Sequence, residues 1–165
     1  NRFYFVHPDG TVQHYDKKHL FTFGGEHKRF TAGTERVVVN FRGVRILLEV
    51  CYDLRFPVWA RNLGDYDMIL YVASWPTPRV DAWSALLRAR AIENQCYVAG
   101  VNRMGVDPAC EYSGGSAIID PYGKTIAECP WGRESAVSAD IDMEALQTFR
   151  KKFPVLDDAD PFTLI

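Results

Sequence analysis

The sequence predicts one α/β domain with a mixed β-sheet, spanning residues 1–165. Short apolar segments rich in β-branched residues alternate with a long helical segment, as in folds whose helices pack on a partly parallel sheet. Other neighbouring strands are joined by short turns that contain glycine, which is typical of antiparallel hairpins. No repeat, low-complexity run or linker divides the chain, so we expect a single core.

The composition is that of an ordinary globular protein, with 47% hydrophobic and 24% charged residues. A formal net charge of −2 gives no electrostatic reason to expect nucleic acid or an anionic membrane as a partner. No apolar run approaches the ~20 residues that span a bilayer, and the first residues do not resemble a signal peptide. The four cysteines stand far apart, which argues against a zinc site and a disulfide framework. We therefore expect a cytoplasmic protein without a metal site.

The first part of the chain predicts two hairpins separated by a glycine-punctuated loop at residues 23–33. Asp-Gly and Arg-Gly pairs supply the two turns. The expected strands are Phe3–Val6 with Thr11–Tyr15, and Glu35–Phe41 with Val44–Val50. A short helix, Pro57–Leu63, should follow and end at Gly64, because proline favours the first helical position and glycine the C-cap.

The second part predicts the long helix, Asp81–Gln95, between two buried strands. Its spacing of three and four residues places one set of side chains on one face: Trp83, Leu86, Leu87, Arg90 and Asn94. The other expected elements are strands Met68–Ala73 and Tyr97–Val101, a hairpin of Ser116–Asp120 with Lys124–Ala127, a strand Ser135–Ile141 and a helix Met143–Lys151. The tail from Phe153 to Ile165 should have no regular structure.

Cys51 stands where the strand Val44–Val50 ends and a helix is about to begin. Strand, tight turn with a nucleophilic side chain, then helix is the arrangement of a nucleophile elbow, which lifts the sulfur out of the sheet. The alternative is that Cys51 is a small buried apolar side chain, as free cysteines commonly are. Cys96, Cys110 and Cys129 lack such a turn, and we expect them to be structural.

The segment Cys51-Tyr52-Asp53-Leu54-Arg55-Phe56-Pro57 resembles the nucleophile segment of the carbon–nitrogen hydrolase (nitrilase) superfamily. Tyr15-Asp16-Lys17-Lys18-His19-Leu20-Phe21 is similar to the lysine motif of that family, which implies that Lys17 is catalytic. Glu26, seven residues before Gly33, is similar to the second glutamate segment of the family. From spacing alone, the lysine and the glutamate would be ordinary exposed charges.

The resemblance implies a role for each of these residues. Cys51 would attack an amide carbon, while Lys17 and the backbone N–H of Tyr52 hold the oxyanion. Glu26 would have an accessory role, orienting Lys17 and the leaving nitrogen. Asp53 and Arg55 are expected to fix the elbow. A papain-like pairing of Cys51 with a histidine is a weaker alternative, because no residue is recognisable in the sequence as the partner that orients the imidazole.

Ser74 and Trp75 follow the strand Met68–Ala73 and could form the walls of a substrate pocket, because strand ends in α/β sheets line clefts. A simple core position for Trp75 is an equal alternative. We expect His19 to fix its loop by hydrogen bonding. Arg90, Glu93 and Asn94 are expected to form a structural polar network, since a buried arginine must be paired.

Four further segments resemble the omega-amidase branch of the superfamily: Asn1–Phe3, Val58–Leu63, Ser74–Arg79 and Lys152–Asp160. The resemblance implies an αββα sandwich with mixed sheets, no cofactor, and a homodimer or higher even oligomer. The implied substrate is the terminal amide of a 2-oxo dicarboxylic acid, 2-oxoglutaramate or 2-oxosuccinamate. Hydrolysis would pass through a Cys51 thioester to a carboxylate and ammonia.

One feature departs from the family pattern. The glutamate that serves as general base in the family lies upstream of the lysine, and residues 1–16 contain no glutamate. We therefore expect the chain to correspond to the C-terminal two-thirds of the family fold, without its N-terminal portion. Glu26 and Glu49 are the acids that could replace the base.

Three functional alternatives remain open at this stage. The first is an amidase whose base lies in a segment outside these residues. The second is another carbon–nitrogen hydrolase, either a carbamoyl-amide hydrolase or a nitrilase. The third is a non-catalytic nitrilase-like domain that binds a small acid or a partner protein.

Overall fold

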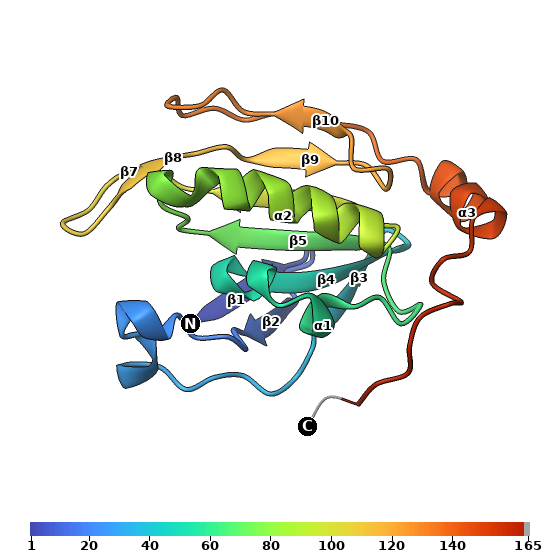
Figure 1. Ribbon diagram of the computed structural model, residues 1–165, viewed down its shortest axis with the longest axis horizontal. Helices are drawn as coiled ribbons and strands as arrows, with labels where there is room; N and C mark the ends of the chain where they lie inside the picture. Colours follow the sequence, from blue (N-terminus) through green and yellow to red (C-terminus); the bar gives the residue numbers. More distant parts are fainter. Residues whose placement is uncertain (164–165) are drawn as a thin grey trace.

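The computed structural model describes residues 1–163, and its centre is a six-stranded mixed sheet (Figure 1). The strand order is β10-β9-β6-β5-β4-β3. Strands β4, β5 and β6 are parallel, whereas β3 pairs antiparallel with β4, β9 with β6, and β10 with β9. The strands are β3 (Val38–Phe41), β4 (Val44–Val50), β5 (Met68–Ala73), β6 (Tyr97–Asn102), β9 (Ala117–Ile119) and β10 (Thr125–Glu128). The predicted mixed α/β class is confirmed.

Two small antiparallel hairpins accompany this sheet. The first joins β1 (Arg2–Val6) to β2 (Val12–Asp16). The second joins β7 (Met104–Val106) to β8 (Glu111–Ser113) and was not predicted. Its strands have three residues each, too few to show an alternating pattern in the sequence.

Helix α2 (Val80–Glu93) forms the crossover between the parallel strands β5 and β6 and lies across one face of the sheet (Figure 1). The predicted buried face is confirmed for Trp83, Leu87 and Arg90, while Leu86 is partly buried. The helix packs closely on β6 at Gly100, where a Cβ atom would come within 2.6 Å of the Leu87 side chain.

The opposite face of the sheet is covered by the β1–β2 hairpin. Ile46, Leu48 and Val50 of β4 pack there with Phe3 and Tyr15 of the hairpin. The layers are therefore α2, the six-stranded sheet and the hairpin. Burial on both faces accounts for the almost continuously apolar sequence of β4 and β5.

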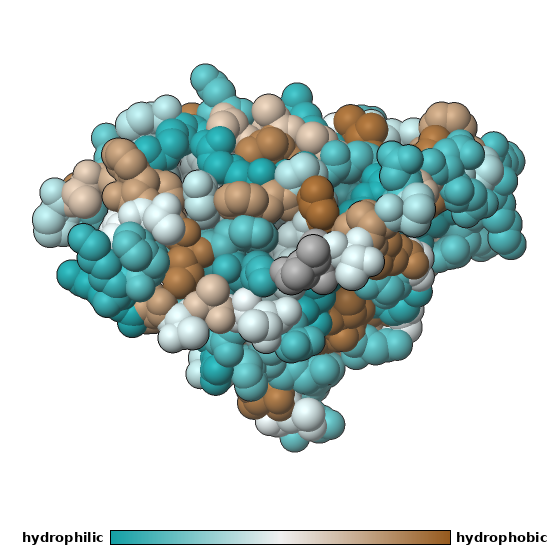
Figure 2. Space-filling model, turned by 60° about the horizontal axis from the view of Figure 1, so that its bottom comes forward, coloured by the Kyte–Doolittle hydropathy of each residue, from teal (hydrophilic) through white to brown (hydrophobic). Residues whose placement is uncertain are grey.

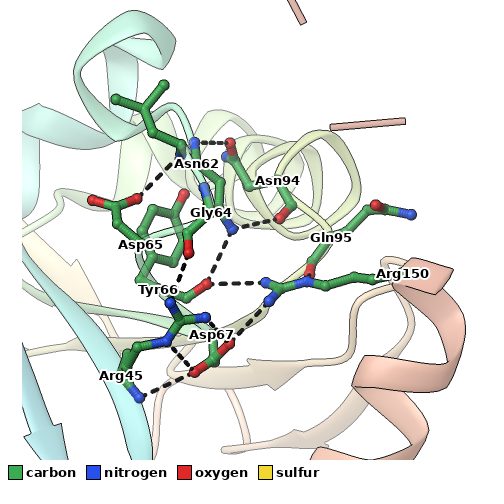
Figure 3. Close-up of polar contacts among 10 residues, drawn as sticks. Arg45, Asn62, Gly64, Asp65, Tyr66, Asp67, Asn94, Gln95 and Arg150 are labelled. Atoms are coloured by element: carbon green, nitrogen blue, oxygen red, sulfur yellow. Dashed lines mark hydrogen bonds and ion pairs between the residues drawn. The ribbon is translucent and has the colours of Figure 1, made fainter. Parts of the chain in front are cut away.

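Helix α3 (Met143–Lys152) lies at the periphery and is held to the sheet by a polar network rather than by a large apolar face. Arg150 donates to a carboxylate oxygen of Asp67 at 2.9 Å and to the carbonyl oxygens of Tyr66 and Gln95 (Figure 3). Arg45 of β4 binds the same Asp67 carboxylate at 2.8 Å. Asp67 directly precedes β5, so this buried acid connects α3 with β4 and β5.

Three expected elements differ from the structure. Helix α1 (Pro57–Ala60) ends three residues early, because the Asn62 backbone N–H and side chain bind Asn94 and the Tyr66 carbonyl instead of continuing the helix. The predicted strand at residues 135–141 is wrong: the segment pairs with no described strand. The predicted loop contains two 3₁₀ turns, at Thr22–Gly24 and Glu26–Lys28.

The remaining predicted elements are confirmed to within a few residues at their ends. In the C-terminal tail, residues 164 and 165 lie outside the described part of the chain. Within residues 1–163, none of the helices has both the length and the apolar character needed to cross a bilayer.

The surface carries its apolar side chains in several small groups separated by hydrophilic residues, as the face in Figure 2 shows. One such set is on the outer side of the β1–β2 hairpin, where Tyr4, Val6 and Val12 are each more than half exposed. Small exposed apolar groups such as this one are normal on protein surfaces.

Candidate active site

Cys51 is the first residue after β4 and has a left-handed backbone conformation, with φ of 49°. This region is costly for a residue other than glycine, and such strain concentrates at functional sites. Residues Cys51–Arg55 then form a 3₁₀ turn that leads into α1. The predicted tight turn is present, but a 3₁₀ turn rather than an α-helix follows the cysteine directly.

The buried carboxylate of Asp53 holds this turn in place. It accepts a hydrogen bond from the Val50 N–H at 3.0 Å and one from the Tyr15 hydroxyl at 2.9 Å. Its other oxygen lies 2.9 Å from the His19 backbone nitrogen and 2.8 Å from His19 Nδ1. Asp53 therefore ties the elbow to β2 and to the loop that follows β2.

His19 fixes its loop, as expected. Its ring also stacks on Phe56 with centroids 3.8 Å apart. Among the described residues, His19 is not part of the wall of the cavity that contains Cys51. The geometry therefore gives no support to a papain-like pairing of Cys51 with this histidine.

A cavity of about 800 Å³ opens above the carboxyl ends of β4 and β5. All six residues singled out in the sequence contribute to its wall: Lys17, Glu26, Cys51, Tyr52, Ser74 and Trp75. Ligands of α/β folds bind at this end of the parallel strands. The structure thus brings together residues that are up to 58 positions apart.

Lys17 and Glu26 form a nearly buried ion pair on one side of this cavity. Lys17 Nζ lies 2.6 Å from Glu26 Oε2, and the lysine is only 3% exposed. The Phe21 N–H donates to the same oxygen, and the Asn1 side chain donates to the other, each at 2.6 Å. Burial acts to raise the pKa of Glu26, but these hydrogen bonds and the lysine charge outweigh it and hold the pKa below its ordinary value. Glu26 is therefore an anion that fixes Lys17.

The pKa of the Cys51 thiol is shifted in the opposite direction, above its ordinary value. Burial raises its pKa, and the positive charge of Lys17 opposes this only in part. Cys51 Sγ lies 3.8 Å from the Ser74 carbonyl oxygen. The resting thiol is therefore protonated, and attack on a substrate requires a proton acceptor.

Alkylation of Cys51 should consequently require alkaline pH. A raised pKa means that the thiolate forms only above the pH at which an ordinary cysteine ionises, near 8.5. We expect the rate of iodoacetamide modification, followed by mass spectrometry of the Cys51 peptide, to rise through a midpoint above that value. Lys17→Met should move the midpoint still higher, because the opposing positive charge is lost. A midpoint below that of free cysteine would contradict this reading.

Trp75 has both of the expected roles, since it lines the cavity and belongs to the core. Its N–H donates to Asn102 Oδ1 at 2.7 Å, and its indole N–H donates to the Arg79 carbonyl oxygen at 2.7 Å. Ser74 is exposed at the cavity edge. Two hydrogen bonds thus fix Trp75 in the cavity wall, one from its backbone and one from its indole ring.

Two arginines in the cavity wall were not recognised as site residues in the sequence. The Arg55 guanidinium lies 5.0 Å from the centroid of the Trp75 ring, and that of Arg79 lies 5.5 Å from the Phe21 ring. Neither has an acidic partner within residues 1–163. The expectation that Arg55 ties down the elbow is wrong: the side chain faces the cavity and makes no hydrogen bond to the described residues.

The β7–β8 hairpin supplies a further part of the wall, through Cys110 and Tyr112. Asp107 holds this hairpin, because its carboxylate accepts from the Cys110 N–H and the Tyr112 hydroxyl at 2.9 Å each. Cys110 thus lines the cavity, and its structural role stays a prediction. Cys96 and Cys129 are buried, as expected.

Comparison with known proteins shows the family. Residues 1–151 match the carbon–nitrogen hydrolase family model. The chain belongs to the carbon–nitrogen hydrolase family. It is 55% identical over 165 residues to omega-amidase YafV of Escherichia coli (strain K12), covering 99% of this chain and 64% of that protein. It is 41% identical to 2-oxoglutaramate amidase of Bacillus subtilis (strain 168), covering 96% of this chain and 62% of that protein.

Solved structures agree with this assignment. XC1258 from Xanthomonas campestris, a CN-hydrolase superfamily protein described with an arsenic adduct in its active site, superposes with a TM-score of 0.96 at 48% identity. The match covers all of this chain and 65% of that structure. The predicted superfamily, its omega-amidase branch and the nitrilase-type fold are confirmed. The chain spans about two-thirds of the length of these relatives, slightly less in each case.

Proposed function

We propose that this carbon–nitrogen hydrolase releases ammonia from the terminal amide of a 2-oxo dicarboxylic acid, of the 2-oxoglutaramate or 2-oxosuccinamate type. The observation that carries the proposal is a single cavity that combines Cys51, the Lys17–Glu26 pair and two arginines without acidic partners in the described chain. The names of the relatives, omega-amidase and 2-oxoglutaramate amidase, support the same substrate class.

In the proposed reaction, a general base that residues 1–163 do not supply takes the Cys51 proton and later gives it to the leaving nitrogen, while the Cys51 sulfur attacks the amide carbon. Negative charge develops on the amide oxygen, where Lys17 and the Tyr52 N–H stabilise it. The carbon–nitrogen bond breaks, the nitrogen takes up a proton and leaves as ammonia, and a Cys51 thioester remains. Water then attacks the thioester and releases the carboxylic acid and the free thiol. Cysteine suits both steps because thiolate is a strong nucleophile and a good leaving group.

Glu26 is assigned to orient Lys17 and the leaving nitrogen rather than to take the Cys51 proton. Its pKa is lowered, and its two oxygens already accept hydrogen bonds from Lys17, Phe21 and Asn1. Glu49 does not line the cavity in the described structure. Neither acid therefore matches the requirements of a general base, which needs a free oxygen near the sulfur.

Arg55 and Arg79 are the proposed carboxylate-binding groups. Each guanidinium lies over an aromatic ring, which limits its motion, and each keeps its N–H donors available in the cavity wall. Arginine donors suit a carboxylate because they bind it in a bidentate manner. An unsubstituted neutral amide offers no such partner, so the two arginines favour an acid amide.

The substrate assignment is tested by comparing 2-oxoglutaramate with pentanamide, a neutral amide of the same chain length. Arg79→Met and Arg55→Met should each raise the KM for 2-oxoglutaramate about tenfold to a hundredfold, because a charged hydrogen-bond partner is lost. Turnover of pentanamide, measured as ammonia release, should change little. Equal losses for both amides, or preference of the unaltered protein for pentanamide, would contradict the assignment.

The protonated Cys51 thiol and the engaged Glu26 favour a second candidate, a non-catalytic domain that binds a small 2-oxo acid in the same cavity. Calorimetric titration with 2-oxoglutarate separates the two. Binding without any Cys51-dependent ammonia release would favour this candidate. Cys51-dependent release would favour the amidase.

We further infer that residues 1–165 belong to one domain, which acts without a metal or organic cofactor as a cytoplasmic homodimer or higher even oligomer. The four free cysteines are consistent with a reducing compartment. The oligomeric state can be measured by light scattering coupled to size-exclusion chromatography.

A further inference from the structure

Glu49 is a buried acid beneath the elbow that the proposed reaction does not use. It is 0% exposed and stands two residues before Cys51 on β4, in register with Tyr71 on the neighbouring strand β5. Tyr71 belongs to the core between the sheet and α2. Neither Glu49 oxygen has a hydrogen-bond partner, and neither does the Tyr71 hydroxyl.

These three atoms belong to a larger group of buried polar atoms. Seven buried side-chain nitrogen and oxygen atoms of the described residues have no hydrogen-bond partner. Five of them belong to four residues, which we call the Glu49 cluster: Glu49, Tyr71, Arg36 and Arg90. The two arginines contribute their Nε groups. The positive charges of both arginines act to lower the pKa of Glu49, and Tyr71 shares the core under α2 with Leu87 and Ala91, between which Arg90 stands on the helix.

The charge state of Glu49 follows from its surroundings. Burial and the negative charge of Asp53 raise its pKa well above the ordinary value, and the positive charges of Arg36 and Arg90 do not offset this. Glu49 is therefore a neutral acid that can both donate and accept a hydrogen bond. Buried groups of this kind are satisfied by bridging water when they are too far apart for direct bonds.

Arg90 connects the Glu49 cluster with the elbow. Its Nη2 donates to the Leu54 carbonyl oxygen at 2.6 Å, within the 3₁₀ turn that begins at Cys51. Its Nη1 donates to Glu93 at 2.8 Å, and only its Nε faces the interior without a partner. The strained turn is thus held from the hairpin side by Asp53 and from the α2 side by Arg90.

We propose that Glu49 is a positioning residue, because the Glu49 cluster holds Arg90 where it binds the carbonyl group of Leu54. Glu49 acts on Cys51 through this contact and does not touch the substrate. The inference gives the buried acid a part in the proposed amidase reaction, and in that sense rests on the proposed function. The mobility of the elbow tests it independently of any substrate.

The test compares Glu49→Leu with Glu49→Gln. Leucine fills a similar volume without polar atoms, whereas glutamine keeps hydrogen-bonding groups of the same length. We expect amide hydrogen exchange of the peptide covering residues 51–56, measured by mass spectrometry, to accelerate at least about tenfold in Glu49→Leu, since the elbow opens locally. Glu49→Gln should stay within about twofold of the unaltered protein. Where turnover is measured, Glu49→Leu should lower kcat and leave KM nearly unchanged.

Tyr71→Phe and Tyr97→Phe form a matched pair that remains informative if Glu49→Leu fails to fold. Both remove one buried or nearly buried hydroxyl, but that of Tyr97 binds Asp142 at the opposite end of the parallel strands. Only Tyr71→Phe should accelerate exchange at residues 51–56. Unchanged exchange in both Glu49→Leu and Tyr71→Phe would overturn the proposal. Absence of ammonia release from the unaltered protein would count against the proposed function, while the exchange result would still decide the role of Glu49.

Discussion

Replacing Cys51 by alanine is expected to abolish ammonia release from 2-oxoglutaramate, with a loss on the order of 10⁴-fold or more. The reason is that the proposed reaction passes through a covalent bond to this sulfur, and no other thiol stands at a strained strand end. The protein should remain folded, because Cys51 is only partly buried and alanine removes a single heavy atom. Ammonia release and thermal unfolding should be measured on the same preparation.

Cys110→Ala is the matched control, since Cys110 is the other thiol in the cavity wall. It should lower turnover by no more than about threefold, because it lies on the β7–β8 hairpin without the elbow geometry. Abolition of turnover by Cys110→Ala, with activity retained in Cys51→Ala, would reverse the assignment of the nucleophile.

Replacing Lys17 by methionine should lower kcat about 10²- to 10³-fold and change KM much less. Losing one preorganised donor to a developing oxyanion has this effect in other enzymes. The change also leaves Glu26 without its cationic partner in a partly buried position, so a loss of stability should accompany it. Steady-state kinetics and thermal unfolding together separate the two consequences.

Lys18→Met provides the comparison for this variant. The Lys18 ammonium lies over the Trp59 ring, 5.1 Å from its centroid, and is not part of the described cavity wall. Its replacement should leave kcat within about twofold of the unaltered protein. A larger loss in Lys18→Met than in Lys17→Met would show that the motif had been aligned incorrectly.

The sequence predicts the structure best where residues only a few positions apart determine it. The β1–β2 and β3–β4 hairpins follow from their glycine turns, and α2 follows from its spacing. Cys51 is suggested by its place between a strand and a helix, whereas Lys17 and Glu26 are recognised only through motif resemblance, because spacing alone does not distinguish them from ordinary polar residues.

The predictions that fail concern features that are determined by contacts between segments distant in the sequence. Residues 135–141 have the composition of a strand but no described partner strand, and α1 is cut short by contacts of Asn62 with Asn94. Arg55 and Arg79 become recognisable only when the cavity is formed and neither is found to have an acidic partner within residues 1–163. Cys110 reaches the cavity through a hairpin too short to leave a periodic pattern.

The Asp53 carboxylate has a consequence for the order of folding. Its partners Tyr15 and His19 lie 38 and 34 positions earlier in the chain, so these contacts of the elbow form only when the β1–β2 hairpin and the loop after it have docked on the sheet. Contacts between segments this far apart carry a larger loop-closure cost than local contacts do. We therefore expect the complete elbow only in chains whose hairpin has docked, because the local contact of Asp53 with Val50 supplies just one of its hydrogen bonds.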